Sequence, residues 1–216
     1  EAVARLRARK HREEKPLALM APDVAAAEAL VELDPAAREA LAGRQRPIVL
    51  CPQRPDAGVA PAVNPHNRLL GVMLPYTPLH HLLLAEGGPE GRGFRALVMT
   101  SGNVSEEPIC LGNEEAACRI GGRAARGAIA DKMLLHDRDI HLRTDDSVVR
   151  VLGGRVRQLR RSRGYAPAPV ALPPGLLPRG APPVLAAGAH LKNTLCLLRG
   201  DEAFPSQHVG DLANAE

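Results

Sequence analysis

Short apolar runs of strand length alternate along this chain with segments of helical pattern, and this alternation constrains the fold more than any other feature. Strands are predicted at 16–20, 47–51, 69–75, 96–103 and 132–136. Helices are predicted at 1–11, 24–32, 34–43, 77–86 and 113–121. A β-hairpin that turns at Gly153-Gly154 is predicted at 145–162. Apolar strands separated by helices are typical of a sheet buried on both faces, so the sequence predicts an α/β domain.

The composition changes after the hairpin. Residues 164–183 contain seven prolines, and such a run is expected to leave any β-ladder and form a semi-rigid extended linker. Residues 184–216 then begin a strand–turn–strand pattern that is too short for an independent domain. We therefore predict one domain over 1–163, a linker over 164–183 and the start of a second domain over 184–216. The chain begins inside a helical pattern without a start signal, so we expect it to have been cut at its front.

Charge and composition narrow the functional classes. A formal net charge of +4 favours anionic partners in general, whereas aromatic residues are too few for a single-strand nucleic-acid platform. The four cysteines include no C-x-x-C pair, so we predict no zinc knuckle and expect reduced thiols in a cytoplasmic protein. We expect no signal peptide and no membrane span, because two prolines and two histidines interrupt the most apolar stretch, 69–85.

Two polar features at the ends of elements are candidates for anion binding. Lys10, Arg12 and Lys15 lie between the first helix and the first strand, and each charge-assisted hydrogen bond contributes on the order of 1.5–3 kcal/mol. The turn 99–105 (MTSGNVS) follows an apolar strand, where ligands of open α/β sheets bind. Its hydroxyls, amide and glycine suit a phosphate or carboxylate. A solvated helix face and a plain polar turn remain open as alternatives.

Acidic and basic side chains also flank the hairpin. Asp145 and Asp146 precede its first strand and either hold Mg²⁺ or end a turn. The run 159–164 (LRRSRG) either protects an edge strand by charge or contributes cations to a site. The histidines have no spacing typical of a metal site, so no metal ligands are predicted in this chain.

Several longer phrases resemble one known family. KHREEKPLALM, NRLLGVMLPYTPLHHLLL, LVMTSGNVSEEPI, LLHDRDIHLRTDDSVVR and LRRSRGYAPAPV look like the YrdC-type domain of the HypF carbamoyltransferases of [NiFe]-hydrogenase maturation. GAHLKNTLCLLRGDEAFPSQHVGDL resembles the start of the ASKHA-like transfer domain of that family. The resemblance implies a YrdC/RibB-like twisted mixed open sheet with flanking helices, followed by the first strands of an ASKHA-like domain. The family's acylphosphatase-like domain, its zinc modules and the first YrdC-type strand have no counterpart in these residues, so zinc is expected only in those other regions.

The resemblance implies an ATP-dependent carbamoyltransferase. In the family, carbamoyl phosphate is cleaved to carbamate, which reacts with ATP to give carbamoyl adenylate and pyrophosphate. The carbamoyl group then passes to the C-terminal cysteine of the partner protein HypE, as a precursor of cyanide ligands. The YrdC-type domain is expected to perform the adenylate step with ATP and Mg²⁺, and this chain alone is expected not to complete the reaction. Adenylation spreads charge over phosphate oxygens, so positioned cations matter more than a covalent nucleophile.

The resemblance also assigns roles to residues of the first two candidate features. Lys10 and Arg12 match the Lys-x-Arg that contacts the ATP phosphates in YrdC-type domains, and they are the predicted catalytic pair. Ser101 and Asn103 match the Ser-x-Asn of that fold as nucleotide-binding residues, with Gly102 in place of the more usual alanine.

Further nucleotide-binding roles are implied later in the chain. Ser147 lies in DDSVV, which resembles a Ser/Thr-Val-Val element near the nucleotide. Arg160 matches the arginine of the closing strand, with Arg161 as a one-residue register alternative. Lys192 and Asn193 match a turn that lies near phosphate in ASKHA folds.

Three other functions stay open at this stage, and the third is a natural carbamoyltransferase of small-molecule biosynthesis. A YrdC-type fold also presents a basic concave face that resembles a platform for double-stranded RNA, and such binding would weaken steeply with salt. A tRNA threonylcarbamoyl-adenylate synthase is the second alternative, although SQHVGDL and YTPLHHLLL speak against it.

Overall fold

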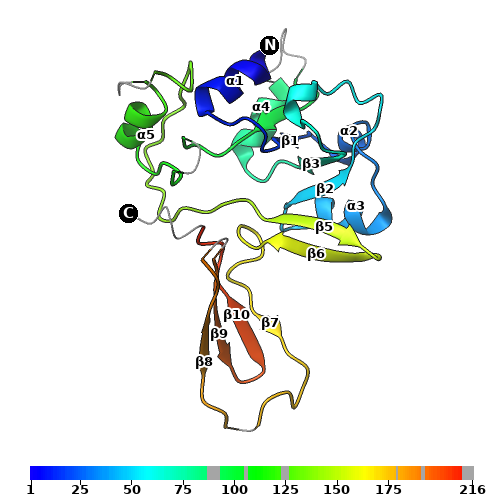
Figure 1. Ribbon diagram of the computed structural model, residues 1–216, viewed down its shortest axis with the longest axis vertical. Helices are drawn as coiled ribbons and strands as arrows, with labels where there is room; N and C mark the ends of the chain where they lie inside the picture. Colours follow the sequence, from blue (N-terminus) through cyan, green and yellow to red (C-terminus); the bar gives the residue numbers. More distant parts are fainter. Residues whose placement is uncertain (87–92, 105–106, 123–126, 179, 191–192, 211–216) are drawn as a thin grey trace.

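A computed structural model describes residues 1–86, 93–104, 107–122, 127–178, 180–190 and 193–210 of the chain. Its first part is built on a six-stranded sheet in the order β4-β1-β3-β2-β5-β6 (Figure 1). The strands are β1 (Ala18–Met20), β2 (Ile48–Pro52), β3 (Leu69–Met73), β4 (Leu97–Met99), β5 (Val148–Leu152) and β6 (Arg155–Arg160). Strands β1 and β3 are parallel, as are β2 and β5, and the other neighbours are antiparallel. The predicted mixed α/β sheet and its hairpin are confirmed.

Five α-helices and one short 3₁₀ helix flank this sheet among the described residues. They are α1 (Ala2–Lys10), α2 (Val24–Glu28), α3 (Pro35–Ala42), η1 (Pro61–Val63), α4 (Pro78–Glu86) and α5 (Asn113–Arg119). The side chains of Asp23 and Asp34 accept hydrogen bonds at the starts of α2 and α3, which stabilises short helices whose first amides have no partner. Thr77 caps α4 in the same way, as predicted.

The prediction of a strand at 132–136 is wrong. This segment is extended but pairs with no strand among the described residues. Its leucines stay exposed, Leu134 at 76%, and the segment is held instead by Asn113, whose amide donates to the carbonyl of His136. An apolar run has strand length whether or not a free sheet edge lies beside it, so the sequence could not exclude this outcome.

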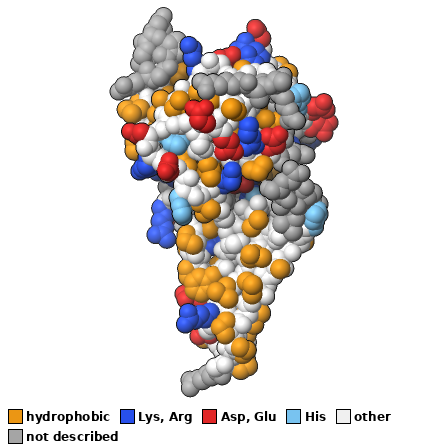
Figure 2. Space-filling model, turned by 90° about the vertical axis from the view of Figure 1, so that its left-hand side faces the viewer, with side chains coloured by type: hydrophobic (Ala, Val, Ile, Leu, Met, Phe, Trp, Pro, Cys, Tyr) orange, Lys and Arg blue, Asp and Glu red, His pale blue; other side chains and the backbone are white. Residues whose placement is uncertain are grey.

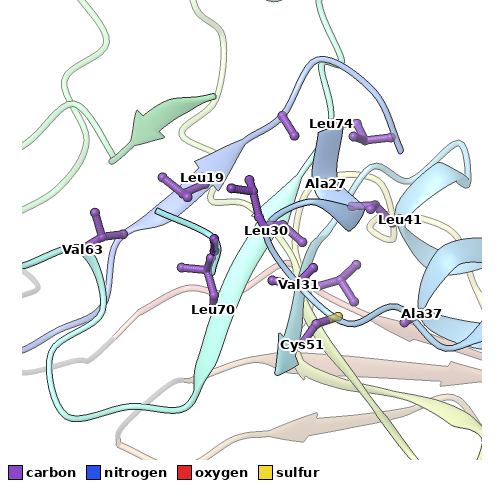
Figure 3. Packing of buried hydrophobic residues seen from close by; sticks show 14 of the residues in the cluster. Leu19, Ala27, Leu30, Val31, Ala37, Leu41, Cys51, Val63, Leu70 and Leu74 are labelled. Atoms are coloured by element: carbon purple, nitrogen blue, oxygen red, sulfur yellow. The ribbon is translucent and has the colours of Figure 1, made fainter. Parts of the chain in front are cut away.

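One face of the sheet carries the main core. Leu70 and Val72 of β3 belong to a buried cluster that also contains Leu30 and Leu41, and Figure 3 shows Leu70, Leu30 and Leu41 on this face. The alternate residues of each strand point to the opposite face. There, Met73 packs under α4 in a smaller cluster. This second face is only partly covered, contrary to the prediction of burial on both faces, and the uncovered part forms the cavity described below.

A second, antiparallel sheet follows in the order β7-β10-β9-β8, and in Figure 1 it extends below β5 and β6. Its strands are β7 (Val170–Ala171), β8 (Val184–Ala187), β9 (Leu195–Arg199) and β10 (Glu202–Pro205). Strand β7 lies in the proline-rich segment, so the prediction that this segment leaves every ladder is wrong. Val170 and Ala171 pair with β10 at the edge of the second sheet. Neighbouring prolines, which lack a main-chain N–H, are tolerated there because an edge strand needs fewer hydrogen-bond donors.

The second sheet has an apolar outer surface. Strands β8 and β9 leave apolar side chains exposed, such as Leu185 and Leu197, and these form much of the tapered lower surface in Figure 2. The two parts touch through hydrogen bonds from His208 N to Arg161 O and from Gln207 Nε2 to Arg143 O. None of the described helices has the length and apolar character that a bilayer span requires.

Candidate functional site

A cavity of about 620 Å³ lies over the second face of the six-stranded sheet. Its floor is apolar and includes Ala18, Ile48, Gly71 and Val148. A Cβ atom at Gly71 would lie only 2.9 Å from Cγ2 of Ile48, so glycine keeps this floor open in the middle of β3. Polar groups from the loops that flank the strands form the rim. A flat apolar floor with a polar rim is typical of small-molecule sites.

The junction between α1 and β1 brings Arg12 to this rim. Helix α1 ends at His11, whose left-handed φ of 52° turns the chain back. The guanidinium of Arg12 then donates to the carbonyls of Lys15 (3.1 Å) and Pro16 (2.6 Å) and reaches Oγ1 of Thr100 at 3.4 Å. Thr100 also lines the cavity. Arg12 is therefore fixed across its own loop with its charge toward β4 and the cavity.

Lys10 lies behind the cavity wall and not in it. The residue is 2% exposed, and its ammonium donates to the main-chain oxygen of Ser101 (2.6 Å) and to Oδ1 of Asn103 (3.2 Å). Burial, followed by the charge of Arg12, lowers the pKa of Lys10 to about 8. In this arrangement Lys10 holds the Ser-Gly-Asn turn from behind.

The turn itself is held by a short chain of hydrogen bonds. The hydroxyl of Ser101 donates to Oδ1 of Asn103 at 2.7 Å, and Nδ2 of Asn103 donates to the carbonyl of Glu107 at 2.6 Å. The amide of Cys110 donates to the carbonyl of Gly102. Ser101 and Gly102 line the cavity, while Asn103 fixes their geometry.

Arg160 lies on the cavity wall formed by β5 and β6. Its Nε donates to the carbonyl of Asp146 at 2.7 Å, and its Nη1 lies 4.0 Å from the carboxylate of Asp145. Arg161, the register alternative, turns away and donates to the carbonyls of Tyr165 and Ala168. The structure therefore brings Arg160, and not Arg161, to the cavity.

Ser147 does not join the site. It is fully buried, and its hydroxyl donates to the carbonyl of Arg163 (2.9 Å) and accepts from the amide of Ser162 (2.7 Å). Successive side chains of a strand point to opposite faces, and Val148 is the neighbour that faces the cavity. Ser147 thus ties the ends of the hairpin together.

Asn193, one of the two residues assigned to the second part, lies apart from the cavity. Asn193 is 8% exposed. In an isolated bridge just before β9, its amide donates to the carbonyl of Gly210 and its carbonyl accepts from the amide of Val209. Lys192 lies outside the described residues.

The sequence reasoning missed one wall of the cavity. Tyr76 follows β3 and lines the cavity, and the guanidinium of Arg163 stacks over its ring at 3.4 Å from the centroid. Arg163 also donates to the carboxylate of Asp146 at 2.7 and 2.9 Å. Burial, together with the charge of Asp146, raises the pKa of Tyr76. No short sequence motif predicts this wall, because the contact between Tyr76 and Arg163 joins the loop after β3 to the end of the hairpin.

The electrostatics of the site favour an anion. Burial and the positive charges of Arg7 and Arg160 lower the pKa of Arg12, so these cations repel one another. Two carboxylates also line the cavity. That of Asp146 is bound by Arg163, and that of Asp145 is only at the limit of ion-pair distance from Arg160. Among the described residues no cluster of three or more His, Cys, Asp or Glu side chains could hold a metal ion. A bound polyanion would relieve the repulsion, as phosphates do in preorganised cationic sites.

The chain also matches known protein families. Residues 1–162 match the Sua5, YciO and YrdC family described as "Telomere recombination", and residues 179–216 match the family described as "HypF Kae1-like domain". Carbamoyltransferase HypF2 of Cupriavidus necator is 49% identical over 100% of this chain, and carbamoyltransferase HypF of Rhodobacter capsulatus is 46% identical over the same span. This chain covers only 27% and 26% of those two proteins.

Solved structures of HypF and Sua5 proteins are also similar to this chain. The crystal structure of full-length HypF in the phosphate- and nucleotide-bound form is 43% identical, with a TM-score of 0.83 over 98% of this chain and 31% of that one. The structure of P. abyssi Sua5 complexed with L-threonine is 18% identical, with a TM-score of 0.57 over 74% of this chain and 44% of that one, and shows the shared fold alone. Over its whole length the chain is similar to HypF carbamoyltransferases, of which it spans about a quarter, and it belongs to the Sua5/YciO/YrdC family.

Proposed function

We propose that this chain forms the ATP-binding, carbamoyl-adenylating part of a hydrogenase-maturation carbamoyltransferase. The observation that carries the proposal is the convergence of Arg12, Arg160 and the Ser101 turn on one cavity, with Lys10 bonded to the back of that turn. These groups come from three distant parts of the sequence, and of the two acids that line the cavity, Asp146 is already paired with Arg163. The carbamoyltransferase names of the whole-length relatives, and the nucleotide-bound form in which full-length HypF was crystallised, support the assignment.

The proposed reaction begins with carbamate, which carbamoyl phosphate supplies. A carbamate oxygen attacks the α-phosphorus of ATP, the bond to the bridging oxygen of the β-phosphate breaks, and pyrophosphate leaves with that electron pair. Carbamoyl adenylate results. The C-terminal cysteine thiolate of HypE then attacks its carbonyl carbon, and AMP leaves as the sulfur–carbon bond forms. Mg²⁺ enters with ATP as part of the substrate, held by the phosphates.

The chain's own residues supply positioning and charge. Arg12 and Arg160 both line the cavity and neutralise the phosphate oxygens as charge moves onto the leaving pyrophosphate. Ser101 offers a hydroxyl in a turn that Lys10 and Asn103 hold rigid. The apolar floor limits water around a carbamoyl adenylate that hydrolyses readily. The free thiols of the four cysteines fit a cytoplasmic setting.

Pyrophosphate release from ATP by the full-length protein tests the proposal. We expect release that depends on carbamoyl phosphate, and we expect Lys10→Ala or Asn103→Ala to abolish it. Asn113→Ala is the matched control, because that amide binds His136 away from the cavity and its loss should leave release intact. Undiminished release in both the Lys10 and Asn103 variants would reject the site, and release without carbamoyl phosphate would reject the substrate.

A further inference from the structure

Arg7 lies on α1, outside the cavity, yet its side chain binds five main-chain oxygens. Its guanidinium donates to the main-chain oxygens of Arg12 (3.0 Å), Glu13 (3.0 Å) and Lys15 (3.1 Å). It also donates to the carbonyls of Ala62 (2.5 Å) and Val63 (3.3 Å), in η1. One side chain therefore joins the loop that carries Arg12 to a second segment of the fold.

The loop after α1 is folded around this guanidinium. Three carbonyls of residues 12–15 point inward at Arg7, and the amide of Arg12 donates back to the carbonyl of Arg7 at 3.0 Å. From the other side, the Arg12 side chain closes the same loop onto Lys15 and Pro16.

The chemistry of the loop explains why arginine stands at this position. Residues 12–15 lie after the end of α1 and before β1, so neither a helix nor a β-ladder supplies donors to their carbonyls. The Arg7 side chain supplies them instead. Lysine could not serve so many acceptors, because only guanidinium has five donors in a fixed planar fork.

We propose that Arg7 is a positioning residue that sets the place of Arg12 at the cavity, and that it acts on nucleotide binding only through Arg12. This inference rests on the proposed function, since it takes ATP as the ligand of Arg12. The alternative is a purely structural role, in which Arg7 stabilises the first helix without directing the Arg12 side chain. The two roles differ in how the effects of the Arg7 and Arg12 substitutions combine.

A double-mutant cycle on ATP affinity separates them. In the full-length protein, calorimetry would give the ATP Kd of the wild type, Arg7→Met, Arg12→Met and the double variant. We expect Arg7→Met to raise the Kd by about tenfold and the double variant to match Arg12→Met alone, because the two substitutions remove one function. Arg5→Met is the matched control, since the exposed Arg5 side chain bonds to no other described residue, and it should leave the Kd unchanged.

Two results would overturn the inference. One is an unchanged ATP Kd in Arg7→Met, and the other is an Arg7 effect that multiplies fully with that of Arg12→Met. If Arg7→Met lowers the melting temperature too far for calorimetry, Arg7→Lys takes its place in the same cycle, with an intermediate Kd expected and the same two results decisive. If the wild type binds no ATP, the proposed function itself is rejected. This result differs from failure of the Arg7 inference, in which the wild type binds ATP and Arg12→Met weakens that binding.

Discussion

The ammonium of Lys10 donates to the main-chain oxygen of Ser101 at 2.6 Å, although the two residues are 91 positions apart in sequence. This bond joins the end of α1 to the turn after β4. It places the predicted catalytic lysine behind the turn, where it shapes the cavity wall that Ser101 presents.

The buried position of Lys10 predicts a pH dependence of ATP binding. Its pKa of about 8 in the free protein is lowered by burial and by Arg12, while the charge of Cys110 opposes the shift. A triphosphate nearby favours the charged ammonium and raises this pKa, so binding above pH 8 must take up a proton and ATP affinity must fall as the pH rises. Calorimetry at about pH 9 in two buffers of different ionisation enthalpy measures this uptake. Uptake that persists in Lys10→Met would assign it to another group.

The two neighbouring arginines at the end of β6 should have separable roles. Arg160→Gln should raise the ATP Kd by about tenfold, because Arg160 lines the cavity. Arg161→Gln should leave the Kd unchanged and lower the melting temperature, because Arg161 binds main-chain oxygens of residues 165 and 168. Calorimetry and thermal unfolding of both variants check this assignment. A raised Kd in Arg161→Gln with an unchanged Kd in Arg160→Gln would instead assign the nucleotide contact to Arg161.

Gly71 should be required for the depth of the cavity. Gly71→Ala places a methyl group 2.9 Å from Cγ2 of Ile48 and 3.4 Å from Cδ2 of Leu50, over the floor. We expect the ATP Kd to rise by about tenfold, because the Ile48 side chain in the cavity floor must shift to make room for the methyl group. The backbone of Gly71 itself is not in the left-handed region, so alanine adds no backbone strain. Gly112→Ala, whose added methyl meets nothing within 4 Å, is the control. Equal ATP affinity in the two variants would show that the floor does not contact the ligand.

The core between the sheet and α3 should dominate the stability of the first part. Leu41 is completely buried, so Leu41→Ala should lower the free energy of unfolding by about 2–5 kcal/mol. Leu134→Ala, at a position 76% exposed, should change it by no more than about 0.5 kcal/mol. Urea unfolding of both variants gives the comparison. Similar losses at the two positions would mean that the segment 132–136 packs against something in solution.

Local pattern was enough to predict the sheet and its hairpin, because buried strands and capped helices have distinct periodicities. It could not tell that 132–136 finds no partner strand among the described residues or that Val170–Ala171 does, since both outcomes depend on which sheet edges are free. The domain boundaries at 163/164 and 183/184 stay predictions.

For the site, family resemblance pointed to the residues but not to their orientations. The resemblance placed Ser147 near the nucleotide, yet the alternation of β5 turns Val148, and not Ser147, to the cavity. Two further features are tertiary contacts that no sequence spacing predicts. They are the stacking of Arg163 on Tyr76 and the five carbonyls around Arg7.

The most direct test of the central claim is a crystal structure of the full-length protein with a non-hydrolysable ATP analogue. The account predicts the triphosphate in the cavity over β1, β3, β2 and β5, with its oxygens within hydrogen-bond distance of Arg12, Arg160 and the Ser101 turn. A nucleotide bound elsewhere, or phosphates that contact neither arginine, would contradict it.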